Sequence, residues 1–214
     1  MVVAHQNVEE YKGGNKMAVD RGPVLKKCRT LGISPAVLGL DKKIKEDKSG
    51  RVRKKLSDYG LQLREKQKAK FIYGILEKPF RNYFTKAEKM KGQTGENLMI
   101  MLERRLDNVI FRTGLARTRR EARQVVGHKH VLVNGKTVNI PSYLVSAGDK
   151  IEIKEKAKET KRYKEIVDVT GGRIAPTWID ADIENYKATI KNLPTREEID
   201  VPVNEMLIVE LYSK

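Results

Sequence analysis

The sequence predicts an α+β protein, with helices in its first part and a small antiparallel sheet in its second. Apolar residues recur every three or four positions up to Val126 and then alternate from Val131 onward, as amphipathic helices and half-buried strands require. The alternating part contains Asn134-Gly135, a strong signal for a two-residue hairpin because both residues tolerate positive φ. The 214 residues are enough for one or two domains with a sizeable core.

Capping residues place the first helices. Pro23 suits a helix start and Gly32 can end that helix, whereas Ser57 is expected to cap a helix that begins at Asp58. Pro79 interrupts the next apolar face, so we expect a break or a fresh start there. The apolar residues of that face are Ile72, Leu76, Phe80, Tyr83 and Phe84.

Two further helices are expected before the sheet. Thr94 is a candidate N-cap for a helix whose apolar residues continue until Gly114 closes the run. Thr118 and Glu121 fit a capping box, in which the Thr118 hydroxyl accepts from the Glu121 amide and the Glu121 side chain reaches back. The apolar residues of the first of these helices are Leu98, Leu102, Leu106, Val109 and Ile110.

The rest of the chain predicts strands with one helix among them. Val138 and Ile140 continue the ladder that begins at Val131, and Ile151 and Ile153 form another strand. A short helix is expected within 155–169, followed by two strands around the turn at 182–185. The period of 204–212 fits a helix or a strand.

The charge of the chain requires an anionic partner. Lys and Arg number 44 and Asp and Glu 28, which gives a formal net charge of +16. The surplus is +11 over residues 42–91 and +5 over 92–159, and the two ends are close to neutral. Nucleic acid or acidic lipid can supply the opposite charge. Recurrent Leu, Ile and Val make a wholly disordered polycation a poor interpretation.

Several classes of protein are excluded. No uncharged apolar run approaches the roughly 18 residues that span a bilayer, and no signal-peptide pattern opens the chain, so we expect no membrane partner. Cys28 is the one cysteine, which excludes an intramolecular disulfide and a multi-cysteine zinc site. A phosphate loop, a nucleophile elbow and paired carboxylates in a recognisable setting are all missing, so we expect no catalytic residues, metal or cofactor.

The candidate RNA-binding residues are the arginines of 104–123, the polar residues on the following turns and the basic residues of 42–91. Arginine grips phosphate with two parallel hydrogen bonds and stacks on bases, whereas lysine acts as a point charge. Arg119 and Arg123 stand four apart and share a helix face. The full set is Arg51, Arg53, Lys54, Lys55, Lys66, Lys68, Lys70, Arg104, Arg105, Arg112, Arg117, Arg119, Arg120, Arg123, His128, His130, Asn134, Lys136, Asn139, Ser142 and Tyr143.

Three stretches carry a resemblance to a known family. The run ENLMIMLERRLDNVIFRTGLARTRREARQVVGHKHVLVNGKTVNIPSYLV resembles the αL RNA-binding module of the bacterial small-subunit ribosomal protein S four family. SDYGLQLREKQKAKFIYGILEKPFRNYF resembles the N-terminal region of that family, and PVNEMLIVELYSK its C-terminus. The resemblance covers nearly everything from Met17 to Lys214.

The resemblance implies a domain organisation. Residues 17–103 would form a helical N-terminal domain with a basic arm, 104–168 the αL module, and 169–214 the last strands and a closing segment. The family's C-terminus packs back on the helical domain, which favours a helix at 204–212. Residues 1–16 are polar and without a period, and we expect an extension or a disordered segment that precedes a natural start at Met17.

The resemblance also implies a function. Members bind small-subunit rRNA directly at a helix junction of its 5′ domain, help to nucleate assembly and influence decoding accuracy. They contact the fifth protein of the subunit, some repress their own mRNA, and they are cytoplasmic and ribosome-bound. Some relatives bind zinc through several cysteines, but Cys28 stands alone here, and we expect it to pack in the core.

Other interpretations of the same features remain open. The αL module also occurs in enzymes and in stand-alone RNA-binding or RNA-modification accessory factors, and such a factor is the alternative function. The basic arm at 42–56 could be a solvated tail, and the aromatic residues of 71–84 fit the core better than base-stacking platforms. The pair His128 and His130 favours RNA contact or hairpin packing over a metal site, and Asp107 is expected to pair with Arg104 or Arg105.

Overall fold

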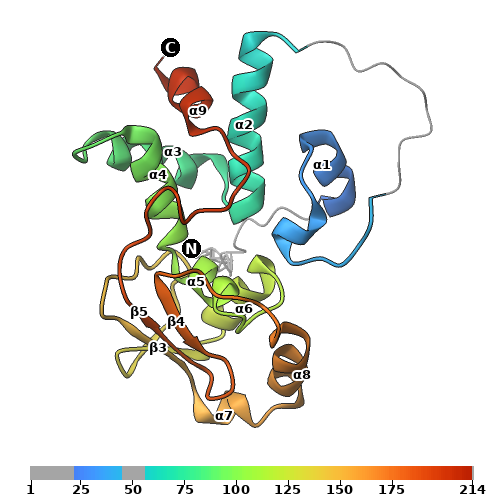
Figure 1. Ribbon diagram of the computed structural model, residues 1–214, viewed down its shortest axis with the longest axis vertical. Coiled ribbons are helices and arrows are strands. Elements are labelled where there is room, and N and C mark those ends of the chain that lie inside the picture. The colour runs from blue at the N-terminus through green and yellow to red at the C-terminus, as the bar shows by residue number, and fades with distance from the viewer. Residues whose placement is uncertain (1–21, 45–55, 214) are drawn as a thin grey trace, which may run out of the picture.

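The protein consists of two parts stacked along the long axis of the molecule (Figure 1). The computed structural model describes residues 22–44 and 56–213. We call residues 22–44, 56–103 and 199–213 the helical part, and 104–190 the sheet part. The expected extension at 1–16 and most of the basic arm, including Arg51, Arg53, Lys54 and Lys55, lie outside the described residues.

The helical part begins where the capping residues predict. Gly32 ends the first helix with a left-handed backbone at φ 68°, and the Ser57 hydroxyl accepts from the Gly60 amide at 3.3 Å. The expected fresh start near Pro79 is confirmed, because one helix ends before Gly74 and another begins at Glu77. The elements are α1 (Val24–Leu31), the 3₁₀ turn η1 (Pro35–Leu38), α2 (Asp58–Tyr73), α3 (Glu77–Glu88), α4 (Thr94–Glu103) and α9 (Glu205–Tyr212).

The core of the helical part is closed by the end of the chain. Helix α9 packs against α2 and α4, so 204–212 contains a helix that returns to the helical part, as the family resemblance implies. The ring of Tyr212 stacks on Phe84 with centroids 4.4 Å apart, and Ile208 is fully buried. Cys28 is buried in this core too, as expected.

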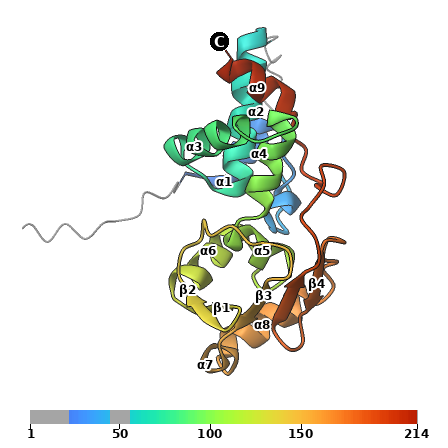
Figure 2. The ribbon, with the colours of Figure 1, turned by 90° about the vertical axis from the view of Figure 1, so that its left-hand side faces the viewer.

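The sheet part contains five antiparallel strands in the order β2-β1-β3-β5-β4. The inward residues of β1, β3 and β5 share one core with helices α5, α6 and α8; in Figure 2 α5 and α6 lie above β1 and β3, and α8 lies below them. Asn134 and Gly135 both have positive φ, which confirms the two-residue hairpin. The elements are α5 (Leu106–Arg112), α6 (Arg119–Gly127), β1 (Val131–Val133), β2 (Lys136–Val138), β3 (Lys150–Ile153), α7 (Glu155–Lys158), α8 (Lys161–Thr170), β4 (Ile179–Asp182) and β5 (Lys187–Ile190).

Two predicted helices are each divided in two. The run expected to continue to Gly114 breaks at Arg105, which has extended backbone (φ −66°, ψ 136°) and bridges to Leu144. The amide of Leu106 donates to the Tyr143 carbonyl. The segment after the hairpin thus supplies the acceptor that a preceding helical carbonyl would otherwise provide. The helix expected in 155–169 breaks between α7 and α8. Apolar spacing alone did not predict these breaks, since the periodicity continues across them.

Three details at element ends also differ from the prediction. Gln93 occupies the N-cap position of α4, and Thr94 is the first helical residue. In the capping box of α6 the Thr118 hydroxyl accepts from Glu121 as predicted, but the Glu121 carboxylate accepts from the Arg117 amide, one residue earlier than expected. Ile140 lies outside β2 and is 56% exposed, so the ladder ends sooner.

A buried carboxylate joins the two parts. Glu103, at the end of α4, accepts from the Tyr73 hydroxyl at 2.6 Å, from Asn108 Nδ2 at 2.7 Å, and from Arg112 Nη2 and Nε at 3.0 and 3.1 Å. Burial alone would raise the pKa of Glu103, but the charge and hydrogen bonds of Arg112 outweigh it and lower that pKa. The carboxylate is therefore ionised at neutral pH and satisfied by donors from both parts.

A close backbone approach fixes the same junction. Gly39 has φ 75°, and a Cβ at this position would lie 2.0 Å from the carbonyl oxygen of Arg117. Two residues before it, the Val37 carbonyl accepts from Arg119 Nη1 at 2.7 Å. The turn after η1 therefore seats directly on the loop between α5 and α6, with no room for a side chain.

Replacing Glu103 should destabilise the whole molecule. Glu103→Ala leaves Arg112, Asn108 and Tyr73 buried without their acceptor, and we expect a loss of about 3–5 kcal/mol in the free energy of unfolding. Urea denaturation measures it, and Glu88→Ala, on the exposed side of α3, is the matched control with an expected change within about 0.5 kcal/mol. A loss below about 1 kcal/mol for Glu103→Ala would show that the carboxylate does not hold the junction.

Candidate nucleic-acid interface

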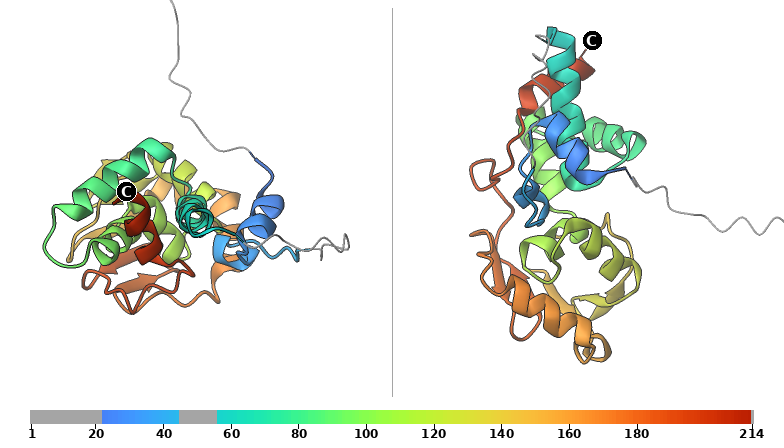
Figure 3. Two further views of the ribbon diagram at one scale, coloured as in Figure 1. Left: turned by 90° about the horizontal axis from the view of Figure 1, so that it is seen from above. Right: turned by 90° about the vertical axis from the view of Figure 1, so that its right-hand side faces the viewer.

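A groove with cationic walls lies between α1, the end of α2 and the start of α6. Its volume is about 940 Å³, and Figure 3 shows α1 beside α2 on the side away from α3 and α4. No residue that lines it within the described part of the chain is Asp or Glu. We call it the basic groove, and its cationic lining residues are Lys26, Lys27, Lys70, Arg119, Arg120 and Arg123.

Hydrogen bonds between elements hold the walls of the basic groove. Arg123, on α6, donates from Nη1 to the Gly74 carbonyl at 2.9 Å, which ties α6 to the end of α2. Gly74 itself caps α2 in the left-handed conformation at φ 63°. The Thr118 hydroxyl starts α6 at the edge of the groove. The position of Lys70 is thus set by the last turn of α2 and that of Arg123 by the middle of α6.

One carboxylate restrains two of the three lysines of α2. Glu77 accepts from Lys66 at 2.9 Å and from Lys70 at 2.6 Å. Partial burial opposes ionisation, but hydrogen bonds from the two lysines lower the pKa of Glu77 from 4.5 to about 2. Lys68 pairs instead with Glu65 at 2.6 Å. All three predicted lysines of α2 therefore have an internal partner with which RNA phosphate has to compete.

Two predicted RNA ligands, Arg105 and Arg119, are buried in this structure and bind partners within the chain. Arg105 is 2% exposed and its guanidinium forms a bidentate pair with Asp107, at 2.6 and 3.0 Å, and also donates to Tyr83. Arg119 is 7% exposed, donates to Asn108 at 2.8 Å, and stacks over the Phe111 ring at 4.2 Å. The predicted pairing of Asp107 with Arg105 is confirmed.

Burial changes the ionisation of Arg119 without removing its charge. Desolvation lowers the pKa of Arg119 to about 10, although Glu103 opposes that shift. The guanidinium therefore remains protonated at neutral pH and acts inside the junction. The i and i+4 spacing of Arg119 and Arg123 does not give them a common environment, because Arg119 is buried and Arg123 is half-exposed.

Three more predicted arginines have structural partners. Arg112 binds Glu103 and also pairs with Asp200 at 2.6 Å. Arg104 donates from Nε to the Val145 carbonyl at 2.9 Å. Arg117 lies 3.8 Å from Glu121 and 4.0 Å from Glu165. Arg120 is exposed at the edge of the basic groove. Arg120 and Arg123 are the two predicted arginines of α6 that face the groove.

The hairpin and its turns form a separate surface. His128, Lys136, Asn139, Ser142 and Tyr143 are exposed there, as RNA contacts would need to be. Asn134 differs, because its amide donates to Asp149 at 2.8 Å and accepts from the Lys150 amide at 2.9 Å. Asn134 therefore stabilises the contact between the hairpin turn and the start of β3. His130 is half-buried against Tyr163, and burial, with His128 nearby, lowers the pKa of His130.

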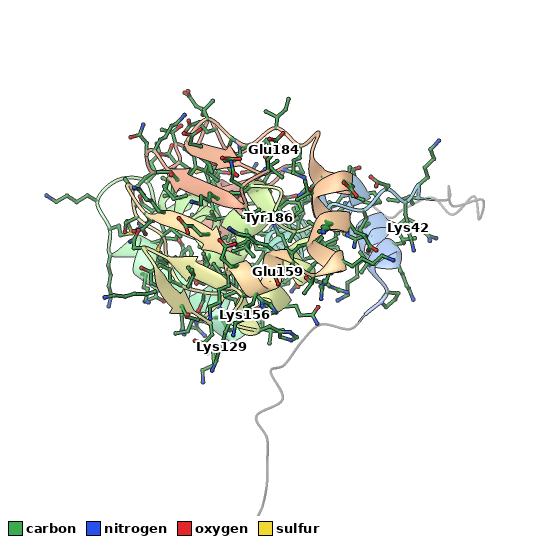
Figure 4. The ribbon with its side chains drawn as sticks, turned by 90° about the horizontal axis from the view of Figure 1, so that it is seen from below. Lys42, Lys129, Lys156, Glu159, Glu184 and Tyr186 are labelled. Carbon is green, nitrogen blue, oxygen red and sulfur yellow. The ribbon has the colours of Figure 1, made fainter. Side chains whose placement is uncertain are left out.

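The far end of the sheet part carries charges of both signs. Seen from below, Lys129 and Lys156 project near Glu159, Glu184 lies beyond them, and Lys42 lies apart near α1 (Figure 4). Lys158 pairs with Glu155, and Lys187 with Glu152. The basic groove therefore differs from this end in having one sign of charge along its lining.

Sequence reasoning missed the α1 side of the basic groove. Lys26 and Lys27 line it from α1, and Gln67 on α2 was missed as well; Lys26 and Gln67 are exposed. A usable signal was present, since the apolar residues Val24, Leu25, Cys28 and Leu31 share one side of this helix and leave Lys26 and Lys27 outside it.

Other site chemistries find no support in the described residues. Within residues 22–44 and 56–213, no group of three or more His, Cys, Asp or Glu side chains is placed to hold a metal ion. None of the helices in that part of the chain combines the length and apolarity needed to cross a bilayer. The aromatic residues Tyr73, Phe80, Tyr83 and Phe84 are buried, as expected of core residues.

Known proteins resemble nearly the whole chain. The family model described as "Ribosomal protein S4/S9 N-terminal domain" matches residues 20–103, and the one described as "S4 domain" matches residues 104–151. Small ribosomal subunit protein uS4 of Lachnospira eligens and that of Agathobacter rectalis are each 68% identical over 198 residues, covering 92% of this chain and all of the relative. That of Lachnoclostridium phytofermentans is 66% identical over 199 residues with the same coverage.

Replacing Arg119 should destabilise the junction between the two parts rather than remove a direct RNA contact. Arg119→Ala leaves Asn108 and the Val37 carbonyl without a donor and opens space beside Phe111, so we expect the free energy of unfolding to fall by about 2–4 kcal/mol. Arg123→Ala is the matched control, with an expected loss below about 1 kcal/mol because its hydrogen bond to the Gly74 carbonyl lies at the surface. Equal unfolding transitions for the two variants would contradict the structural assignment of Arg119.

Removing Glu77 should strengthen RNA binding. Glu77→Gln keeps the shape but releases Lys66 and Lys70 and removes a negative charge beside them, so we expect a two- to fivefold rise in affinity at low salt. Because the pKa of Glu77 is about 2, the wild-type carboxylate is ionised throughout the range from about pH 5 to 8, and the gain should not change across it. Filter binding to an rRNA fragment measures the affinity and its pH dependence. Weaker binding by Glu77→Gln would show that Glu77 does not compete with RNA phosphate for these lysines.

Proposed function

Because the chain belongs to the small ribosomal subunit protein uS4 family, we propose that the basic groove is the main surface with which it holds small-subunit rRNA. The chain is a structural, rRNA-binding component of the small ribosomal subunit, and it is not an enzyme. It binds other ribosomal proteins within that particle. The observation that carries the groove assignment is a lining in which, among the described residues, every charged side chain is a cation, with Lys26 exposed and Arg123 half-exposed.

The distribution of charge supports the groove over other faces. Phosphate contacts supply most of the affinity of basic proteins for RNA, and they require cations that are accessible and not already neutralised. Arg105, Arg112 and Arg119 are engaged inside the chain, whereas Lys26 stands exposed at the groove. RNA of irregular shape suits such a surface better than a regular duplex, because the deep major groove of A-form RNA is closed to side chains.

The hairpin surface is proposed as a second point of contact. His128, Lys136, Asn139, Ser142 and Tyr143 are exposed on the hairpin and on the segments before and after it, and they can reach phosphate, ribose or bases. On sequence grounds we also propose RNA contacts at Arg51, Arg53, Lys54 and Lys55. The division of the chain into domains at residues 104 and 169 is likewise a proposal from the sequence.

Finer roles follow as proposals from family membership. We propose that the rRNA target is a helix junction of the 5′ domain, that binding there helps to nucleate assembly, and that the protein contributes to decoding accuracy. We also propose contact with the fifth protein of the subunit, binding to its own mRNA, and a cytoplasmic location on the ribosome. The near-neutral C-terminal residues suit contact with protein better than contact with RNA.

Salt dependence tests the proposed function. If about eight phosphates are neutralised, the logarithm of the binding constant should fall with the logarithm of salt concentration with a slope of about −6 to −7. A titration against a fragment of the 5′ domain of small-subunit rRNA measures it, with an unrelated RNA of the same length as the control. A slope near −1, or equal affinity for both RNAs, would contradict specific rRNA binding through a multi-cation surface.

A further inference from the structure

The basic groove has an apolar floor beneath its cationic rim. Leu31 from α1, Phe71 from α2 and Ile75 from the turn after α2 line it. A purely electrostatic phosphate track needs no such floor, because phosphate oxygens gain nothing from contact with hydrocarbon. The combination of an apolar floor and a cationic rim instead fits a ligand that carries a flat apolar face and an anionic backbone.

We propose that the basic groove takes the base of one unpaired rRNA nucleotide, stacked on Phe71, with the adjacent phosphates held by Lys26 and Arg123. The inference rests on the proposed function and deepens it, since it names the part of the RNA that enters this groove. Single-stranded RNA is commonly recognised by stacking of splayed-out bases on aromatic side chains.

Phe71 has the placement that stacking requires. Its ring is half-buried at the edge of the helical core, so its position is fixed while part of it faces the groove. Lys27 Nζ lies over the ring, 5.6 Å from its centroid. A base stacked over the ring can replace this cation–π contact.

The size and the polar groups of the groove also fit one nucleotide. Its volume of about 940 Å³ lies within the range of roughly 300–1,000 Å³ of small-ligand pockets. The exposed amide of Gln67 at the rim can donate to and accept from a base edge. Arg123 projects from the opposite wall, and its buried Nε has no hydrogen-bond partner. Paired bases present only their edges, so only an unstacked base can place its face on Phe71.

Variants of Phe71 and Lys26 separate stacking from charge. Phe71→Leu keeps an apolar side chain but removes the ring, and it should weaken binding to the rRNA fragment about tenfold without changing the salt slope. Phe71→Tyr retains the ring and should stay within about twofold of wild type. Lys26→Ala should weaken binding and reduce the magnitude of the salt slope by about 0.7–0.9, whereas Lys161→Ala on α8, the matched charge control, should change neither.

The outcomes distinguish this inference from the proposed function. Failure of wild-type protein to bind the fragment would remove the proposed function itself. Wild-type binding that Phe71→Leu and Lys26→Ala leave unchanged would overturn only the base site, provided that thermal unfolding shows all variants folded. Loss of affinity in Phe71→Tyr equal to that in Phe71→Leu would also overturn it. If millimolar AMP displaces the RNA, the groove binds free nucleotides, and the inference that it binds a nucleotide within an RNA strand is overturned.

Discussion

The arrangement of the two parts depends on one buried carboxylate. Glu103 ends α4 and accepts hydrogen bonds from Tyr73 in the helical part and from Asn108 and Arg112 in the sheet part. A buried charge is tolerated only when its partners satisfy it, so this acceptor requires both parts to keep one mutual orientation. The side-chain oxygen of Asn108 accepts from Arg119, which also donates to the Val37 carbonyl and extends the same network to η1.

The proposed RNA surface follows from that orientation. The basic groove draws its walls from α1 and α2 on one side of the junction and from α6 on the other, so neither part contains it alone. A site held by packed helix ends loses little conformational entropy on binding, which favours recognition of an RNA shape. Cations that the sequence presents as equivalent therefore divide into two kinds, with Arg119 building the groove and Arg123 facing it.

Much of the fold could be predicted from the sequence, because its signals are local. Ser57, Gly32 and Asn134-Gly135 specify element ends through their own backbone and side-chain chemistry, and the structure agrees at each. The break at Arg105 could not be predicted, since it depends on the bridge to Leu144, far along the chain. The same reason limits the site: spacing places an arginine on a helix face, but only the neighbouring elements decide whether that face meets solvent or another part.

The central claim is that rRNA occupies the basic groove between α1, α2 and α6. Photo-crosslinking tests it most directly, with a photoreactive amino acid at Gln67, exposed on the groove rim, and in a second variant at Glu165, exposed on α8. The account predicts that Gln67 crosslinks to one discrete, unpaired site of small-subunit rRNA and that Glu165 gives little crosslinking. Equal yields from both positions, or no crosslink from Gln67 in a complex that binds rRNA, would contradict it.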